Sequence, residues 1–221
     1  MVLPDDLRDR ADRYTVAGQI DMFTHKLTFG PYTAAKVWIS ESSSQSGPTL
    51  FNGRTEHIED KHKGSFELAT ASGTFRGRCV EALVEVLKHE TNWELEGHNG
   101  EVGLHSRDRA NLAAGSKSYR CDIGQPSGPE LRFQFIFGEP GSVHGDDIDL
   151  RIAPLGSTSE RPRLAVGLSA GFVLLAGQTP VAAVDVSTID GSVTLSRELS
   201  PSHRDRVAAI AVGLLLLRSM D

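Results

Sequence analysis

The sequence lacks several features that would identify a protein class at once. No block of Lys and Arg stands out among its 221 residues, and the formal net charge is −6. Because nucleic acids are bound mainly through clustered Lys and Arg, this charge argues against a nucleic-acid partner. Phosphate-loop and dinucleotide fingerprints are missing as well, so we expect no cofactor.

Long hydrophobic segments and cysteines are also scarce. Residues 1–10 contain no apolar core of a signal peptide, and no run reaches the roughly 20 apolar residues that a membrane span needs. We therefore expect a cytoplasmic protein without a transmembrane span, located at most peripherally at a membrane. Cys79 and Cys121 could pair, but their spacing does not bring them together, and in the cytoplasm we expect two free thiols.

The most informative feature that is present is an unbroken apolar run near the C-terminus. Residues 207–217 read Val-Ala-Ala-Ile-Ala-Val-Gly-Leu-Leu-Leu-Leu. The run is too short to cross a membrane, and a helix that is apolar on every face must be surrounded by protein. It therefore predicts a buried core helix over 203–219. Ser202 followed by Asp205 resembles the start of a capping box, with Asp205 near the positive end of the helix.

Most of the remaining chain has the pattern of antiparallel β-structure. Short apolar–polar segments alternate with Gly, Ser, Asn and Pro, which favours hairpins over βαβ units. Asn99-Gly100 is typical of a type I′ hairpin turn, and a second hairpin over 66–78 is expected to turn near Ser72-Gly73. The other expected strands cover residues 19–29, 33–40, 92–96, 101–105, 118–123, 131–137, 148–153, 163–168, 172–176, 181–186 and 192–199.

Several segments are less regular. Residues 80–89 fit both a helix and a strand, and because their surroundings are rich in β-structure we favour a strand. The polar stretch 41–47 and the charged stretch 56–63 predict solvated loops. Trp38 and Trp93 are expected to pack in the core or at its rim. Residues 1–13 form a charged N-terminal segment, either a short surface helix or an irregular end, before a single domain over 14–221.

The C-terminal part resembles a known family. Residues 177–184, Gly-Gln-Thr-Pro-Val-Ala-Ala-Val, resemble the "turn, Pro-Val-Ala-x-Val" hairpin of tubby C-terminal-like domains. A turn at Asp190-Gly191, the strand 192–195 and the apolar terminal helix follow, as at the end of the LURP-one-related and phospholipid-scramblase branch. The resemblance covers mainly residues 163–221. It implies a closed antiparallel β-barrel of about twelve strands around the buried helix.

One motif is typical of an enzyme. Residues 167–171, Gly-Leu-Ser-Ala-Gly, match the nucleophile elbow of α/β-hydrolases, and Ser169, Asp185 and His203 follow in the chain order of that triad. The elbow needs a substantial helix after the serine, and the apolar segment 172–176 is too short for one. A Gly-flanked turn between two strands is therefore the favoured interpretation, and a serine hydrolase remains the alternative.

Two charged clusters are candidate binding sites. Asp146, Asp147 and Asp149 offer carboxylates of the kind that bind Ca²⁺. The favoured interpretation is an acidic turn leading into a strand, without a metal. Arg76 and Arg78 lie two residues apart on one expected strand, where they could meet an anionic head group or simply face water.

Together, these patterns favour a non-enzymatic binding or scaffold module. The absence of a convincing catalytic set and the family resemblance both point this way. We expect its partner to be a membrane surface, a phospholipid or a protein. The alternatives are the serine hydrolase that uses Ser169 and a Ca²⁺-responsive lipid-binding protein that uses the three aspartates.

Overall fold

The structure, a computed structural model, describes residues 4–18, 26–46, 54–98, 101–126, 128, 130–137, 139–155, 171–186 and 191–217. The secondary structure in these residues is mainly β. The elements are α1 (Asp5–Arg8), β1 (Ala11–Thr15), β2 (Leu27–Phe29), β3 (Tyr32–Ser46), β4 (Arg54–Thr70), β5 (Gly73–His98), β6 (Glu101–Gly124), β7 (Glu130–Ile136), β8 (Gly141–Gly145), β9 (Ile148–Pro154), β10 (Gly171–Ala176), β11 (Thr179–Asp185), β12 (Ser192–Ser196) and α2 (Pro201–Leu216).

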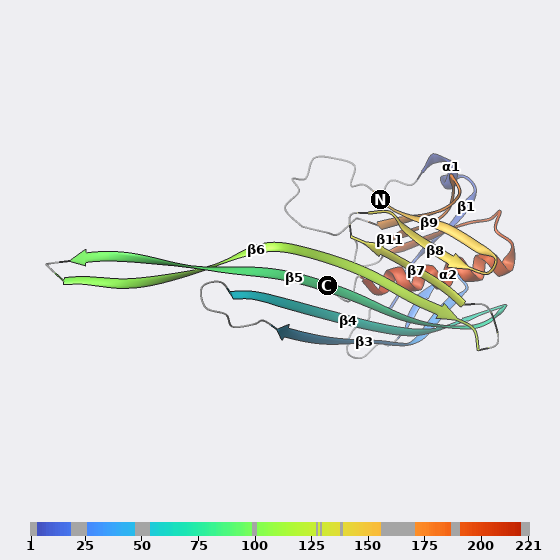
Figure 1. Cartoon of the computed structure of the whole chain (residues 1–221). Helices are drawn as coiled ribbons and strands as arrows, with labels where there is room; N and C mark the ends of the chain where they lie inside the picture. The colour runs from blue at the N-terminus through green and yellow to red at the C-terminus, as the bar shows by residue number, and fades with distance from the viewer. Residues whose placement is uncertain are drawn as a thin grey trace. The chain divides into compact units, whose positions relative to one another are not determined.

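The strands form one sheet that nearly closes on itself. Its order is β1-β12-β11-β10-β9-β8-β7-β6-β5-β4-β3-β2, so apart from β1 each strand lies beside its neighbours in the chain. The two outermost strands approach each other through Ala17 and Thr28, whose backbones exchange two hydrogen bonds of 2.8 Å. The predicted fold class, an antiparallel β-barrel of about twelve strands with a C-terminal helix, is thereby confirmed (Figure 1).

The chain divides into two compact units. The first contains Met1–Ser40, His62–Glu81 and Ser118–Asp221, and therefore a part of every strand together with both helices. The second contains Glu41–Lys61 and Ala82–Lys117, which belong to strands β3 to β6. The candidate site described below lies in the first unit.

Helix α2 fills the interior of the barrel. Every residue from Val207 to Leu217 is buried, and apart from Gly213 their side chains form one core cluster with the inward side chains of the strands. On β6, the hydroxyl of Tyr119 donates a hydrogen bond of 2.6 Å to the Gly213 carbonyl of the helix. A Cβ atom at Gly213 would lie 3.0 Å from the Cys121 sulfur and from the Phe133 ring, so the helix and the sheet are in close contact there. The predicted buried core helix is confirmed.

The start of α2 differs from the prediction. The helix begins at Pro201, and the cap is Ser200, whose hydroxyl accepts a hydrogen bond of 3.3 Å from the His203 backbone N–H. Proline is favoured in the first helical turn because its missing N–H has no partner to lose there. The predicted capping box from Ser202 to Asp205 is wrong.

Asp205 is instead a buried link between the helix and the sheet. It is 6% exposed. Its carboxylate accepts hydrogen bonds from the Tyr32 hydroxyl at 3.1 Å, and from the Ser72 backbone N–H at 3.0 Å and hydroxyl at 2.6 Å. Burial, followed by the charge of Asp205, raises the pKa of Tyr32 to about 12. A buried carboxylate needs such donors, because an unpaired buried charge is costly.

Two of the predicted hairpins are present, and the turn predicted at Asn99-Gly100 lies outside the described residues. Strands β4 and β5 are joined at Ala71-Ser72, next to Gly73 with φ of +126°. Strands β6 and β7 pair antiparallel, with Ser118 opposite Ile136 and Gly124 opposite Glu130. The ambiguous residues 80–89 lie within β5, which confirms the choice of a strand.

Two predicted loops are strands. Strand β3 continues through residues 41–46, and β4 includes residues 56–63. The serine hydroxyls of Ser42 and Ser44 reach backbone carbonyls of Lys61 and Glu59 at 3.4 Å. A strand that pairs with its neighbour satisfies its backbone groups whether or not its side chains are apolar, so polar composition alone misled the prediction.

Other sequence-based expectations have mixed outcomes. Trp38 is 61% exposed, so the prediction that it packs in the core or at its rim is wrong. The charged segment 1–13 contains α1 and enters β1, which pairs with β12. Residue 47, the expected strands at 19–25 and 163–168, and the side chain of Trp93 lie outside the described residues.

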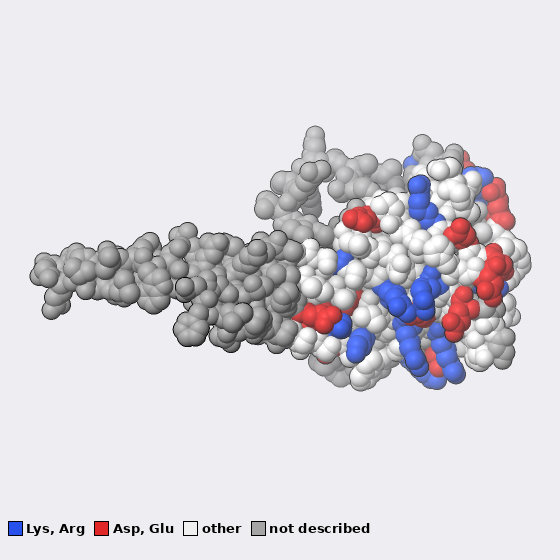
Figure 2. All heavy atoms as spheres, viewed as in Figure 1, with Lys and Arg blue, Asp and Glu red and all other residues white. Residues whose placement is uncertain are grey.

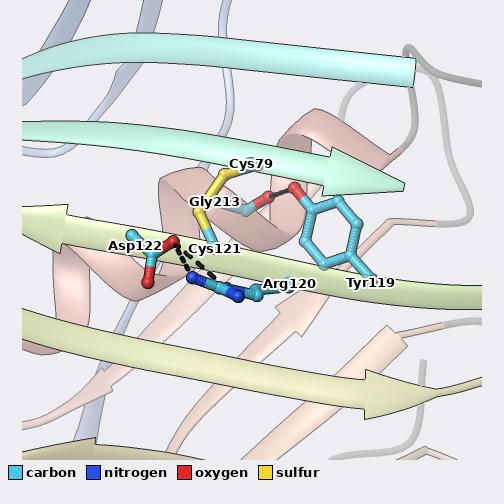
Figure 3. The surroundings of a disulfide bond; sticks show 6 residues. All are labelled: Cys79, Tyr119, Arg120, Cys121, Asp122 and Gly213. Carbon is cyan, nitrogen blue, oxygen red and sulfur yellow. Dashed lines mark hydrogen bonds and ion pairs between the residues drawn. A yellow bond between two sulfur atoms is a disulfide. The ribbon is translucent and has the colours of Figure 1, made fainter. Parts of the chain in front are cut away.

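The two cysteines form a disulfide. Cys79 on β5 and Cys121 on β6 are bonded to each other, with α-carbons 4.0 Å apart, and both are buried (Figure 3). The expectation of two free thiols is therefore wrong. The strands β5 and β6 are neighbours in the sheet, which brings the two residues together. Disulfides are rare in the reducing cytoplasm, so the bond argues against the cytoplasmic location expected from the sequence.

Candidate functional site

The outer face of strands β3 to β7 carries a band of charged side chains. Inward and outward residues alternate along each strand, as on β7, where Leu131 and Phe133 are buried and Arg132 is exposed. The disulfide places Cys79 opposite Cys121, so in this antiparallel pair Arg78 lies across from Asp122. Asp122 in turn lies opposite Arg132. These three outward residues form one row across β5, β6 and β7.

The first charge group joins strands β3, β4 and β5. The Glu67 carboxylate contacts the Lys36 ammonium at 2.8 Å and the Arg76 guanidinium at 3.2 Å. The hydrogen bond from Lys36, helped by the charges of both cations, lowers the pKa of Glu67. Lys36 has φ of +51°, a conformation that residues with a side chain rarely adopt. One carboxylate is thus shared between two cations.

The second charge group, on β6 and β7, also consists of one carboxylate and two cations. The Asp122 carboxylate accepts hydrogen bonds from Arg120 at 2.8 Å and from Arg132 at 2.5 Å (Figure 3 shows the contact with Arg120, on the face away from the disulfide). Burial opposes ionisation of Asp122, but the hydrogen bonds from Arg132 and Arg120 outweigh it and lower the pKa of the carboxyl. Each group therefore carries an excess of one positive charge.

Arg78 lies between these two groups. Its side chain is exposed on β5, and within the part of the chain that the structure describes its guanidinium has no ion pair and no hydrogen bond. Arg76 and Arg78 both line a surface hollow of about 560 Å³, together with Lys36, Glu67, Asp122 and Glu130. The expectation that the two arginines face water is confirmed. The hollow in addition gives them a concave setting.

The charge of this surface contrasts with that of the whole chain. The two charge groups contain four cationic and two anionic side chains, and Arg78 and Glu130 add one of each. The surface thus has five cationic and three anionic side chains, although the chain has a net charge of −6. Figure 2 shows Lys and Arg side chains gathered beside Asp and Glu on the face of the first unit that carries β6 and β7. Such a surface attracts an anion, and arginine can hold a phosphate or carboxylate with two parallel hydrogen bonds.

The predicted hydrolase residues do not form a described triad. Ser169 lies outside the described residues. Asp185 is 4% exposed on β11. His203, in the first turn of α2, pairs through Nε2 with the Asp147 carboxylate at 3.6 Å instead. The histidine of the predicted triad is thus paired with the acidic turn between β8 and β9.

Two of the three predicted calcium residues form ion pairs within the protein. Asp146 and Asp147 form the turn between β8 and β9, and Asp149 lies on β9, as the acidic-turn interpretation predicts. Asp147 pairs with Arg206 and with His203, and Asp149 contacts His144 at 3.2 Å. A search of the described residues finds no group of three or more His, Cys, Asp or Glu that could hold a metal ion.

Sequence reasoning found two members of the charged surface and missed the others. Lys36 and Arg132 were not singled out, because their partners lie on other strands; Arg120 was also missed, although its partner Asp122 lies two residues away on β6. Part of the signal was available: the buried residues of β7 alternate with outward charged residues, and Arg120 and Asp122 share one face of the next strand. The sequence did not show which residues of β5 lie opposite which residues of β6.

Comparisons with known proteins assign no family. No family model and no solved structure matches the chain. The curated protein diguanylate cyclase TpbB, from two strains of Pseudomonas aeruginosa, is 27% identical over 136 residues, which are 62% of this chain. The chain spans only 29% of the length of that relative. None of the described helices is long and apolar enough to cross a membrane.

Proposed function

We propose that this chain is a non-enzymatic binding module that recognises the phosphate-bearing head group of an anionic membrane lipid. The observation that carries the proposal is the exposed Arg78 guanidinium, which has no partner among the described residues and lies in a hollow of about 560 Å³. Arg76 lies beside it, and the two flanking groups each hold one carboxylate between two cations.

A lipid head group fits the chemistry of this surface better than a buried ligand does. The interior of the barrel is occupied by α2, whereas the hollow is open to the outside and mainly polar. A phosphate would bind without breaking the ion pairs of Glu67 and Asp122, because Arg78 has hydrogen-bond donors to spare. The resemblance to the LURP-one-related and scramblase branch of tubby-like domains also supports a membrane surface as the partner, located peripherally.

Sedimentation with lipid vesicles tests the proposal. The purified chain is mixed with neutral phosphatidylcholine vesicles and with vesicles that also contain an anionic phospholipid, at low and at high salt. We expect binding to the anionic vesicles, weaker at high salt because exposed charges are screened. Arg78→Gln is expected to reduce binding several-fold, and Arg13→Gln, which removes an exposed arginine of β1, is the control with the same net charge.

Two results would count against this function. Failure to bind any anionic vesicle would remove the membrane lipid as a partner and leave a protein partner. An equal loss of binding in Arg78→Gln and Arg13→Gln would show that only total charge matters. Repeating the measurement with Ca²⁺ addresses the alternative based on Asp146, Asp147 and Asp149, which requires binding that depends on calcium.

A further inference from the structure

A second hollow, of different character, lies on the outer face of strands β6 to β9. Its volume is about 730 Å³, and its exposed lining is mainly apolar. It is bounded by the region of β6 around Arg120, the end of β7 with Ile136, the connection with Pro140, and Arg151 on β9. Pockets of this size are large enough for a small organic ligand.

The strand register arranges the polar residues of this hollow in a line. Arg120 is opposite Gln134, Gln134 is opposite Ser142, and Ser142 is opposite Arg151. These four side chains therefore form one outward row across four strands. Three strand spacings of about 4.8 Å place the α-carbons of the two arginines about 14 Å apart. The row next to it contains Asp122 and Arg132, which belong to the charged surface described above.

The apolar part of the hollow lies at the end of β7. Ile136 is 47% exposed, which is unusual for a large apolar side chain in the described residues. Phe135 and Tyr119 also border the hollow, but their side chains belong to the core and are 6% and 1% exposed. A side chain at Gly141 would lie 2.5 Å from the Gln134 carbonyl oxygen, so this glycine lets β8 approach β7 closely. Ile136 and Pro140 therefore supply the exposed apolar side chains of the hollow.

The two arginines, Arg120 and Arg151, differ in their hydrogen bonds and ion pairs. Arg120 donates hydrogen bonds to Asp122 at 2.8 and 3.2 Å. Arg151 is exposed, and in the described ranges of the chain its guanidinium has neither an ion pair nor a hydrogen bond. Glu139 is the one carboxylate residue in the lining, which contains two arginines. An anion in this hollow would therefore bind at Arg151.

We propose that this hollow binds a single-chain amphiphile with an anionic head group, a carboxylate or a phosphate. The head group pairs with Arg151, and the hydrocarbon chain lies along Ile136 and Pro140. Because the lining is mainly apolar, we expect a bare anion to bind weakly. Because the Arg151 guanidinium has no partner among the described residues, we expect an uncharged chain to bind weakly as well. This site is separate from the one around Arg78 and does not depend on the proposed membrane function.

Calorimetric titration of the full chain tests this site without a membrane. The probes are decanoate and decyl phosphate, each kept below the concentration at which it forms micelles, with decanol and inorganic phosphate as controls. We expect at least one of the two amphiphilic anions to bind, and both controls to bind much more weakly. Arg151→Gln should weaken binding about tenfold or more, as expected for a charge-assisted hydrogen bond.

Two further variants complete the design. Ile136→Ser should weaken binding of the ten-carbon probes several-fold, because it removes apolar contact from an exposed position that does not support the core. Arg13→Gln, with the same loss of charge as Arg151→Gln, should bind like the wild type. Absence of binding by both amphiphilic anions would overturn the proposal, and so would equal binding by wild type and Arg151→Gln. Because the probes are monomers, either result is independent of the vesicle measurement.

Discussion

The inward and outward faces of the same strands have different roles in this molecule. On β7, the inward residues Leu131, Phe133 and Phe135 are at most 6% exposed and belong to the core around α2. The outward residues of the same strand include Arg132 and Ile136, which lie at the two surface hollows or beside them. A sheet that alternates with a period of two separates these roles residue by residue.

This difference indicates where stability and binding can be changed independently. The inner face is packed against a helix, so a change there alters the free energy of unfolding. The outer face carries charged pairs exposed to water, which contribute little to stability. We therefore expect substitutions on the inner face to unfold the chain, and substitutions on the outer face to alter binding with the fold intact.

The largest effect is expected inside the barrel. Ile210 is fully buried on α2. Ile210→Asp should unfold the first unit, because an unpaired buried charge costs several kcal/mol against a total stability of about 5–15 kcal/mol. Circular dichroism and thermal unfolding measure this. Ser202→Asp places the same side chain at an exposed position of the same helix and should remain folded. A folded Ile210→Asp variant would mean that the helix is not part of the core.

Removal of the disulfide between β5 and β6 should have the second-largest effect on stability. Replacing both Cys79 and Cys121 by Ala opens a link between residues 42 positions apart in the chain. The expected loss is about 2–4 kcal/mol in the free energy of unfolding. Urea unfolding with and without a reductant measures it: reductant should destabilise the wild type and leave the double variant unchanged. A wild type that ignores reductant under unfolding conditions would contradict the disulfide.

The link through Asp205 should have a smaller effect. Asp205→Asn should cost about 1–3 kcal/mol, because donors of Tyr32 and Ser72 lose a charged acceptor. The pKa of Tyr32, about 12, should fall toward 10 but stay raised, since burial is its main cause. Ultraviolet titration reports this pKa. Asp146→Asn, in an exposed turn, is the control and should leave the pKa of Tyr32 unchanged.

The same tyrosine gives a pH dependence with a definite sign. The pKa of Tyr32 is higher in the folded chain, about 12, than its ordinary value of 10. Its contribution to stability is therefore fully present below pH 10 and is lost as the pH rises through 12. In Asp205→Asn this alkaline loss should still begin near pH 10, but it should be smaller and complete at a lower pH.

The smallest effect on stability is expected on the outer face. Asp122→Asn removes the carboxylate that Arg120 and Arg132 share. It should change the free energy of unfolding by at most about 1 kcal/mol. Because the pKa of Asp122 is lowered, this contribution is present near neutral pH and lost in acid. Binding to anionic vesicles should become tighter, since the surface gains one net positive charge. Weaker vesicle binding would contradict the assigned role of this surface.

The parts of the fold that could be predicted are those with local patterns. Residues 207–217 contain no polar side chain, which by itself requires a surrounding core. The alternation around Leu131 and Phe133 predicts a strand with one buried face, and β7 has that pattern. Turn signals at Ser72 and Gly73 also predicted the β4–β5 hairpin. Each of these signals lies within a few residues of the structure that it predicts.

The features that were missed depend on register or on distant partners. A regular two-residue hairpin turning at Asn99-Gly100 would place Cys79 opposite Arg120, whereas the disulfide places it opposite Cys121. A shift of one residue moves a side chain to the other face of the sheet, and the sequence does not reveal it. The partners of Asp205 are likewise 133 and 173 positions away in the chain.

The candidate site shows the same limit. Alternation was enough to place Arg76 and Arg78 on one exposed face, and this was confirmed. The shared carboxylates Glu67 and Asp122 could not be assigned to their cations, because each group joins side chains from two or three strands. The lack of a partner for Arg78 in the described residues is known only once those assignments are made.

One measurement tests the separation of the two faces most directly: thermal unfolding of the wild type and of Arg78→Gln, each with and without anionic vesicles. A ligand that binds only the folded state raises the unfolding temperature. We predict equal unfolding temperatures without vesicles, and a rise with vesicles in the wild type that is largely lost in Arg78→Gln. A markedly lower unfolding temperature of the variant without vesicles, or the same rise in both proteins, would contradict the account.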